Sequence, residues 1–183
     1  MSDEPIRIGE LLVQAGVINK DKLHQRLGIA RQLGLPLGQI LVQSHDLGKD
    51  QFLNALQIQS LLLEELLTTE QAARAVSFLC HEGQELNVAL SKVGFLESQT
   101  LAYRLGDLLL AADVISEDDL TFALLTSGEI AIPLGHALIQ TGVVVPDVVA
   151  AALTAQKQIR SKSVSAEEAI EVLRSTATPG RVS

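Results

Sequence analysis

The segment Leu67-Thr68-Thr69-Glu70-Gln71-Ala72 carries the signals that start an α-helix. The Thr68 hydroxyl can accept a hydrogen bond from an otherwise unpaired backbone N–H group, and Gln71 lies where its amide can bond back to the backbone of Thr68. Glu70 falls in the first turn, where the helix dipole favours a negative charge. Because Leu67 precedes the cap, as a hydrophobic staple requires, the segment predicts a helix over residues 69–82.

The same start pattern is repeated along the chain at nearly constant spacing. In each copy an apolar residue precedes an Asn, Thr or Ser cap, and acidic residues follow in the first turn. The copies begin at Ile18, Leu67, Ile115 and Val164, which are 49, 48 and 49 residues apart. Gln71 and Glu168 complete capping boxes in two of them. A fixed period of this length is typical of a repeat architecture.

A second pattern is interleaved with the first. Pro36-Leu37-Gly38 and Pro133-Leu134-Gly135 open similar short helices 97 residues apart, and Glu85–Leu90 is a weaker copy between them. Proline suits the first helical position because its missing N–H has no partner there. The short helices are followed by glycines that can cap them: Gly16, Gly94 and Gly142.

The predicted fold is therefore all-α, a helical repeat of short and long helices with a period of about 49 residues and no sheet. Short helices are expected near residues 7–15, 36–44, 85–93, 104–112 and 133–141. Longer helices are expected near residues 20–33, 49–66, 69–82, 98–103, 117–127, 146–160 and 166–174. The run Gly142–Pro146 looks like a strand, but its place in the repeat predicts a cap and a loop.

Composition narrows the classes of function. The 183 residues carry a net charge of −8, whereas nucleic acid and anionic lipid both need a basic face, so neither is an expected partner. A small anionic ligand held by one or two arginines is compatible with that charge. The sequence shows no leader pattern and no apolar run long enough to span a membrane, which favours a cytoplasmic location without membrane insertion.

The sequence lacks the motifs of catalysis and metal binding. It has no Gly-x-x-x-x-Gly-Lys-Ser/Thr loop for nucleotide hydrolysis. The adjacent acids Glu64-Glu65 and Asp118-Asp119 point in different directions on a helix and make poor acid–base pairs. Cys80 is expected to be a small buried hydrophobe. Metal-ligand spacing is missing between Cys80 and the four histidines, which are His24, His45, His81 and His136. We therefore expect no enzyme, no catalytic residue, no metal and no cofactor.

The stretch Arg7-Ile8-Gly9-Glu10-Leu11-Leu12-Val13, with the glycine and leucines that follow it, resembles the tandem motif of the MshE-type N-terminal domain. That domain precedes the motor of type II secretion and type IV pilus assembly ATPases, and the motor motif itself is absent from this sequence. The resemblance implies a first unit at residues 1–66, a connecting degenerate repeat at 67–103 and a second unit at 104–174. The tail at 175–183 is small, polar and contains proline and glycine, and this composition predicts disorder.

Several members of this family bind cyclic di-GMP, so the resemblance implies a site for that ligand. By resemblance, the arginine stacks on a guanine and faces phosphate, apolar residues line the base and ribose, and the glutamine bonds a base edge. The residues carried over in the first unit are Arg7, Ile8, Gly9, Leu23, Leu27, Leu37, Gly38, Phe52, Leu56 and Gln59. Those in the second are Arg104, Leu105, Gly106, Leu120, Leu124, Leu134, Gly135, Val149, Leu153 and Gln156.

The chain departs from the family motif at several polar positions. Ala30 and Ser127 stand where the first motif of each unit should end in glutamine, and His45 and Asp113 replace glycines. Prolines replace arginine at the start of the second motifs. Each unit therefore keeps one arginine and one glutamine, half of the expected polar set.

These residues also have a purely structural interpretation. Arg7 and Arg104 can be surface residues paired with a nearby acid, such as Glu10 or Asp107. The glycines can serve tight helix packing, and the leucines can serve the core. Two functions stay open: a regulatory receptor for cyclic di-GMP, and a degenerate adaptor that binds only proteins of secretion, pilus or motility machinery.

Overall fold

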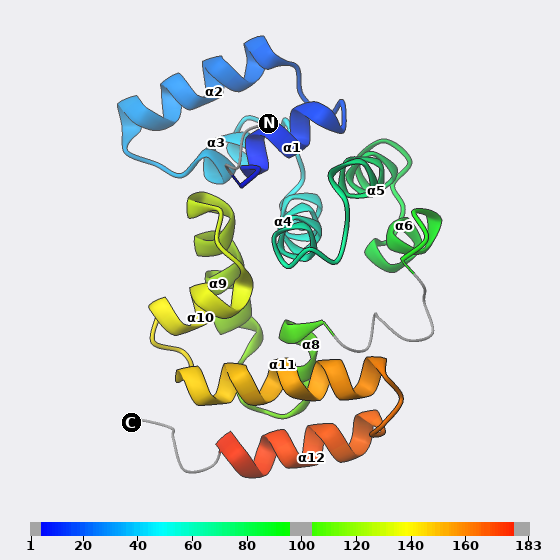
Figure 1. The fold of residues 1–183 in the computed structure, drawn as a ribbon. Helices are drawn as coiled ribbons and strands as arrows, with labels where there is room; N and C mark the ends of the chain where they lie inside the picture. The colour runs from blue at the N-terminus through cyan, green and yellow to red at the C-terminus, as the bar shows by residue number, and fades with distance from the viewer. Residues whose placement is uncertain (1–4, 96–103, 178–183) are drawn as a thin grey trace. The chain divides into compact units, whose positions relative to one another are not determined.

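The computed structural model describes residues 5–95 and 104–177, and in these ranges the chain is helical with no β-strand (Figure 1). The prediction of an all-α fold is therefore confirmed. Five of the described helices have seven residues: α1 (Ile8–Gln14), α3 (Leu37–Gln43), α6 (Leu86–Lys92), α8 (Leu105–Ala111) and α10 (Leu134–Gln140). The longer ones are α2 (Lys20–Leu33), α4 (Lys49–Leu63), α5 (Thr69–His81), α9 (Glu117–Ile130), α11 (Pro146–Arg160) and α12 (Ala166–Ala177).

The helices begin where their caps were predicted. Asn19 Oδ1 accepts a hydrogen bond from the Lys22 N–H group at 2.8 Å. In the predicted box before α5, Thr68 Oγ1 accepts from the Gln71 N–H group and Gln71 Oε1 accepts from the Thr68 N–H group, at 3.2 and 3.0 Å. Matching reciprocal bonds join Ser165 to Glu168. Local side-chain chemistry therefore sets these helix starts.

Three of the longer helices, α4, α9 and α12, end at other residues than the sequence predicts. α4 ends at Leu63 rather than near residue 66, because Glu65 takes the left-handed conformation (φ 57°) and the Leu66 N–H group turns back to the Leu61 carbonyl. α9 continues to Ile130, three residues beyond the predicted end. The helix expected near residues 98–103 lies outside the described part of the chain.

The last helix, α12, continues to Ala177, three residues into the segment expected to be disordered. The hydroxyls of Ser175 and Thr176 both donate to the Val172 carbonyl at 2.8 Å. Their polar groups are thus satisfied within the helix and do not compete with it. The remainder of the predicted tail, residues 178–183, lies outside the described residues.

The chain divides into two compact units, each with its own aliphatic core. The first comprises Met1–Phe95 and Leu124–Pro133, and the second Leu96–Ala123 and Leu134–Ser183. In the first, α1 packs against α4 and α5; in the second, α8 packs against α11 and α12, which lie side by side (Figure 1). The most buried side chains include Leu11, Leu12, Leu41, Ile58, Leu61 and Leu90 in the first unit, and Leu105, Leu108, Leu109, Leu138 and Leu173 in the second. The predicted boundaries after residues 66, 103 and 174 stay predictions.

No single one of the described helices is long and apolar enough to cross a membrane. Only α9 and α10 taken together reach that length and composition, and the break between them bends by 109°.

The short helix α3 approaches α4 closely because it carries a glycine at the contact. A Cβ atom placed on Gly38 would lie 2.2 Å from Cζ of Phe52, which is far inside van der Waals contact. The Phe52 side chain is 5% exposed, so its ring has no free space to move into. Gly38 therefore fixes the spacing of α3 and α4.

Gly38→Ala is expected to destabilise the protein by about 1–3 kcal/mol, because the added methyl overpacks the buried Phe52 ring. Gly28→Ala is the matched control, since Gly28 lies inside α2 with no atom within 4 Å of an added Cβ. That change should stabilise the protein by up to about 1 kcal/mol through helix propensity. Urea unfolding of the three proteins measures both effects, and equal stability of the two variants would contradict the packing argument.

Candidate ligand site

Arg7 occupies the N-cap position of α1, and its side chain is exposed. Its backbone N–H group donates to Glu10 Oε2 at 3.1 Å, so the carboxylate is used to cap the helix. In the part of the chain that the structure describes, no hydrogen bond or ion pair of the Arg7 guanidinium is present. The side-chain ion pair between Arg7 and Glu10, which the sequence left open, is therefore not formed.

Gln59 of α4 lies beside the residue that precedes Arg7. Its Nε2 group donates to the Ile6 carbonyl at 2.9 Å, and the residue is only 1% exposed. Its other amide atom, Oε1, is buried without a hydrogen-bond partner. A buried, unpaired amide oxygen costs about 1–3 kcal/mol. The structure thus bonds the predicted glutamine of the first unit to the residue that precedes the predicted arginine.

Gly128 of α9 lies against the face of α4 that carries Leu56 and Gln59. A Cβ atom on Gly128 would lie 2.2 Å from Leu56 Cδ2 and 3.2 Å from Gln59 Oε1. The segment Leu124–Pro133, which includes the end of this helix, belongs to the first compact unit, so the predicted site residue Leu124 lies with the first unit. Gly128 lies one residue beyond the predicted end of this helix at 127, so the sequence did not indicate the contact.

The glycines of the family motif pack against the chain itself. A Cβ atom on Gly9 would lie 2.7 Å from Leu23, one on Gly106 would lie 2.8 Å from Leu120, and one on Gly135 would lie 2.9 Å from Val149. In each case the covering side chain lies 14 residues after the glycine, as Phe52 does after Gly38. This geometry favours the structural interpretation of the glycines, and their contact with a ligand stays a prediction.

The second predicted site differs from the first at its arginine. Arg104 Nε donates to Asp107 Oδ2 at 2.6 Å and Nη2 donates to Asp107 Oδ1 at 3.3 Å, which makes a two-bond fork with the carboxylate. The Arg104 side chain is only 17% exposed. The ion pair between Arg104 and Asp107, which the sequence left open, is therefore formed.

The remaining predicted site residues are mostly buried. Leu153 is an exception at 44% exposure, whereas Leu56, its counterpart in the first motif pair, is 2% exposed. The buried members are Ile8, Gly9, Gly38, Phe52, Leu105, Gly106, Leu124, Leu134, Gly135, Val149 and Gln156. Those of intermediate exposure are Leu23, Leu27, Leu37 and Leu120. Most of these apolar side chains belong to the core in any interpretation.

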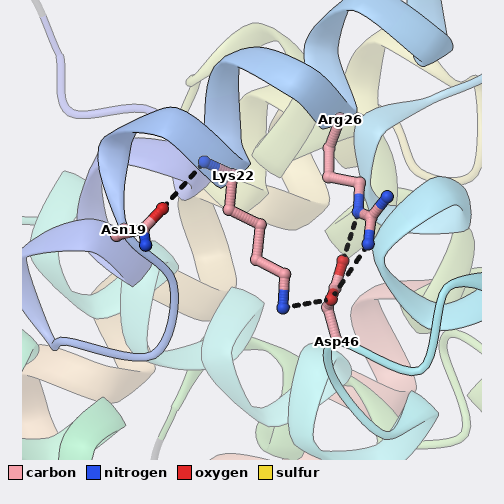
Figure 2. A network of polar contacts seen from close by, with 4 residues as sticks. All are labelled: Asn19, Lys22, Arg26 and Asp46. Atoms are coloured by element: carbon pink, nitrogen blue, oxygen red, sulfur yellow. Dashed lines mark hydrogen bonds and ion pairs between the residues drawn. The ribbon is translucent and has the colours of Figure 1, made fainter.

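The sequence did not indicate a polar network that joins α2 to Asp46 (Figure 2). Arg26 donates to both oxygens of Asp46, at 2.5 and 3.2 Å, and Lys22 Nζ lies 2.6 Å from Asp46 Oδ1. The Asp46 side chain is 3% exposed. Hydrogen bonds from the Arg26 guanidinium are the main reason why the pKa of Asp46 is lowered, and Lys22 adds to the effect.

One sequence signal could have indicated this network. Lys22 and Arg26 are four residues apart, so they share a face of α2. Their partner, however, lies beyond the left-handed residue His45, and only the tertiary fold brings it to α2. The network fastens α2 to the turn after α3.

The described residues offer no other site of obvious chemistry. They include no group of three or more histidine, cysteine or acidic residues that could hold a metal ion. Burial raises the pKa of the Cys80 thiol to about 11, so the thiolate is scarce at neutral pH. The arrangement around Arg7 and Gln59 is thus the strongest candidate.

Comparisons with known proteins give no relative for this chain: no family model, no curated protein and no solved structure matches it significantly.

Asp46→Asn is expected to destabilise the protein by about 1 kcal/mol at pH 7, since it weakens two charge-assisted contacts. The lowered pKa of Asp46 means that its contribution is complete above the unfolded-state pKa and is lost as the pH falls through the folded-state pKa. The stability gap between wild type and variant should therefore shrink below about pH 4. Urea unfolding at several pH values between 7 and 3 measures it.

A second variant shows whether Arg26 is the partner concerned. Arg26→Gln should cost clearly less stability in the Asp46→Asn background than in the wild type, because the contact is already weakened there. Two results would contradict the role of this network. One is a stability difference between wild type and Asp46→Asn that stays constant from pH 7 to pH 3. The other is an equal loss of stability on Arg26→Gln in the wild type and in Asp46→Asn.

Proposed function

We propose that this protein is a non-catalytic regulatory module whose first unit binds cyclic di-GMP, as the resemblance of residues 7–59 to the MshE-type N-terminal domain implies. One observation carries the proposal. The guanidinium of Arg7 is exposed and unpaired. The carbonyl of the preceding residue, Ile6, accepts a hydrogen bond from Gln59, whose own amide oxygen is buried and lacks a partner. Both groups therefore keep unused hydrogen-bonding capacity.

The chemistry of the two groups suits a guanine nucleotide. A guanidinium offers a flat face for stacking on a purine and N–H groups for phosphate oxygens. The free amide oxygen of Gln59 can accept a bond from an N–H group on a guanine edge. Gly128 of α9 lies against that oxygen, so a ligand can reach Gln59 only if α9 shifts. Such a shift has no Gly128 side chain to displace.

We also propose that the chain is built from a repeat of about 49 residues. Described residues with positive φ fall into series with nearly this spacing. One series is Gly16, Glu65, Asp113 and Lys162, separated by 49, 48 and 49 residues; the others are Gly34, Gly83 and Ala131, and His45, Gly94 and Gly142. Left-handed conformation costs a residue with a side chain about 1–2 kcal/mol, so its retention at non-glycine positions supports a shared backbone plan.

A protein-binding adaptor is the second candidate function. Four large hydrophobic side chains among the described residues of the first compact unit are exposed: Leu33 at 61%, Val88 at 37%, Leu125 at 41% and Ile130 at 51%. Exposed apolar groups are the usual anchors of protein contacts. By family analogy the partner would be a protein of secretion, pilus or motility machinery, and the location would be the cytoplasm.

Calorimetric titration of the full chain with cyclic di-GMP tests the receptor function. Wild type should release or absorb heat, and Arg7→Ala should weaken binding at least about tenfold, which is 1.4 kcal/mol, because stacking and phosphate contacts are both lost. Arg31→Ala is the matched control, since Arg31 is an exposed arginine of α2 in the same unit, and it should bind as wild type does.

The same titration separates the two candidates. No heat with wild type at high micromolar ligand would sink the receptor function and leave the adaptor. Equal losses in Arg7→Ala and Arg31→Ala would show that only general positive charge matters, which contradicts a site at Arg7.

A further inference from the structure

The two predicted sites begin with nearly the same four residues. The first reads Arg7-Ile8-Gly9-Glu10 and the second Arg104-Leu105-Gly106-Asp107. The arginine is the N-cap in both, and the acid is the third residue of the short helix that follows. The acids differ in length by one methylene group, and the structure shows that they bond to different partners.

The longer acid caps the helix, and the shorter one holds the arginine. Glu10 accepts from the backbone N–H group of Arg7 at 3.1 Å, which is the reach expected of a capping box. Asp107 places both of its oxygens on the guanidinium of Arg104, at 2.6 and 3.3 Å. The arginine is therefore exposed in the first site and held in a fork in the second.

The fork at Arg104 uses the groups that an anionic ligand would need. A carboxylate and a phosphate accept the same pair of parallel N–H bonds from a guanidinium. A phosphate that binds Arg104 must first displace Asp107. The phosphate then stays close to the negative charge of Asp107, and this repulsion is a second cost of binding. The first site has no such competitor, since the carboxylate of Glu10 is bonded to the backbone.

We propose that Asp107 is an internal competitor of the ligand, and that it restricts tight binding of an anionic guanine nucleotide to the first site. This inference rests on the proposed function, because it concerns the same ligand class. In the wild type, the second site should bind at least about tenfold more weakly than the first, a difference of 1.4 kcal/mol.

Calorimetric titration of the full chain with cyclic di-GMP measures the number of sites. Wild type should show one tight site, and Asp107→Asn should show two, because an amide neither pairs strongly with Arg104 nor repels phosphate. Asp113→Asn is the matched control: it removes one exposed acid at the other end of α8, at a left-handed position that asparagine tolerates. It should keep one tight site.

A second measurement reports on the ion pair without the ligand. Phenylglyoxal modifies accessible guanidinium groups, and mass spectrometry of the peptides gives a rate for each arginine. Arg7 should react faster than Arg104 in the wild type. In Asp107→Asn the rate at Arg104 should rise severalfold while that at Arg7 stays the same, and Asp113→Asn should change neither rate.

The outcomes distinguish this inference from the proposed function. One tight site in the wild type and two in Asp107→Asn support both. Two tight sites in the wild type, or one in Asp107→Asn, overturn the inference and leave the proposed function. If the wild type does not bind and Asp107→Asn binds at one site, the proposed binding at the first site is wrong, but the role of Asp107 as a competitor at the second site is supported. No binding in either protein, or an unchanged Arg104 rate, overturns the inference.

Discussion

Close packing of a side chain onto a bare glycine Cα is the contact on which much of this architecture depends. It joins each of four short helices to the long helix that follows, at Gly9 with Leu23, Gly38 with Phe52, Gly106 with Leu120 and Gly135 with Val149. A seven-residue helix has too few internal hydrogen bonds to be stable alone, so its stability must come from packing. Glycine lets the long helix approach near enough for one Leu, Phe or Val side chain to cover the short helix. The interior can then be filled by aliphatic residues, which agrees with an aromatic content of only 3%.

The caps show why the fold could be predicted from the sequence to such an extent. A helix start such as Thr68 with Gln71 is decided by residues three positions apart, so the sequence contains all the information needed. The C-terminal turns are less readable, because residues with side chains, such as Glu65 and Asp113, adopt the left-handed conformation that was expected of glycine. There the tertiary structure overrides a local preference of about 1–2 kcal/mol. That override explains why the predicted end of α4 was too late.

The candidate site was less predictable than the caps because its contacts join residues that are far apart in the sequence. Arg7 and Gln59 are far apart in the sequence, and only the resemblance to a family, not the periodicity, predicted that they share a site. The partner of the Arg104 guanidinium was named among the alternatives, since Asp107 is local to it. Asp46 with Lys22 and Arg26 was missed because the contact spans a chain reversal. The cover of Leu56 by Gly128 was missed because it joins residues of α4 and α9 that no local pattern relates.

Two local costs coincide where α9 meets α4. Gly128 lies inside a helix, where glycine is less favourable than alanine by about 1 kcal/mol. Opposite it, Gln59 keeps a buried amide oxygen without a partner, at a further cost of about 1–3 kcal/mol. A leucine at position 59 would fill the same space without the polar penalty, and the hydrogen bond from Gln59 to the Ile6 carbonyl, worth about 1 kcal/mol, does not offset the loss. In a chain whose caps and core otherwise agree, costs gathered at one contact are typical of a place kept for function and not for stability. The contact between Gly128 and Gln59 is thus singled out without any family resemblance.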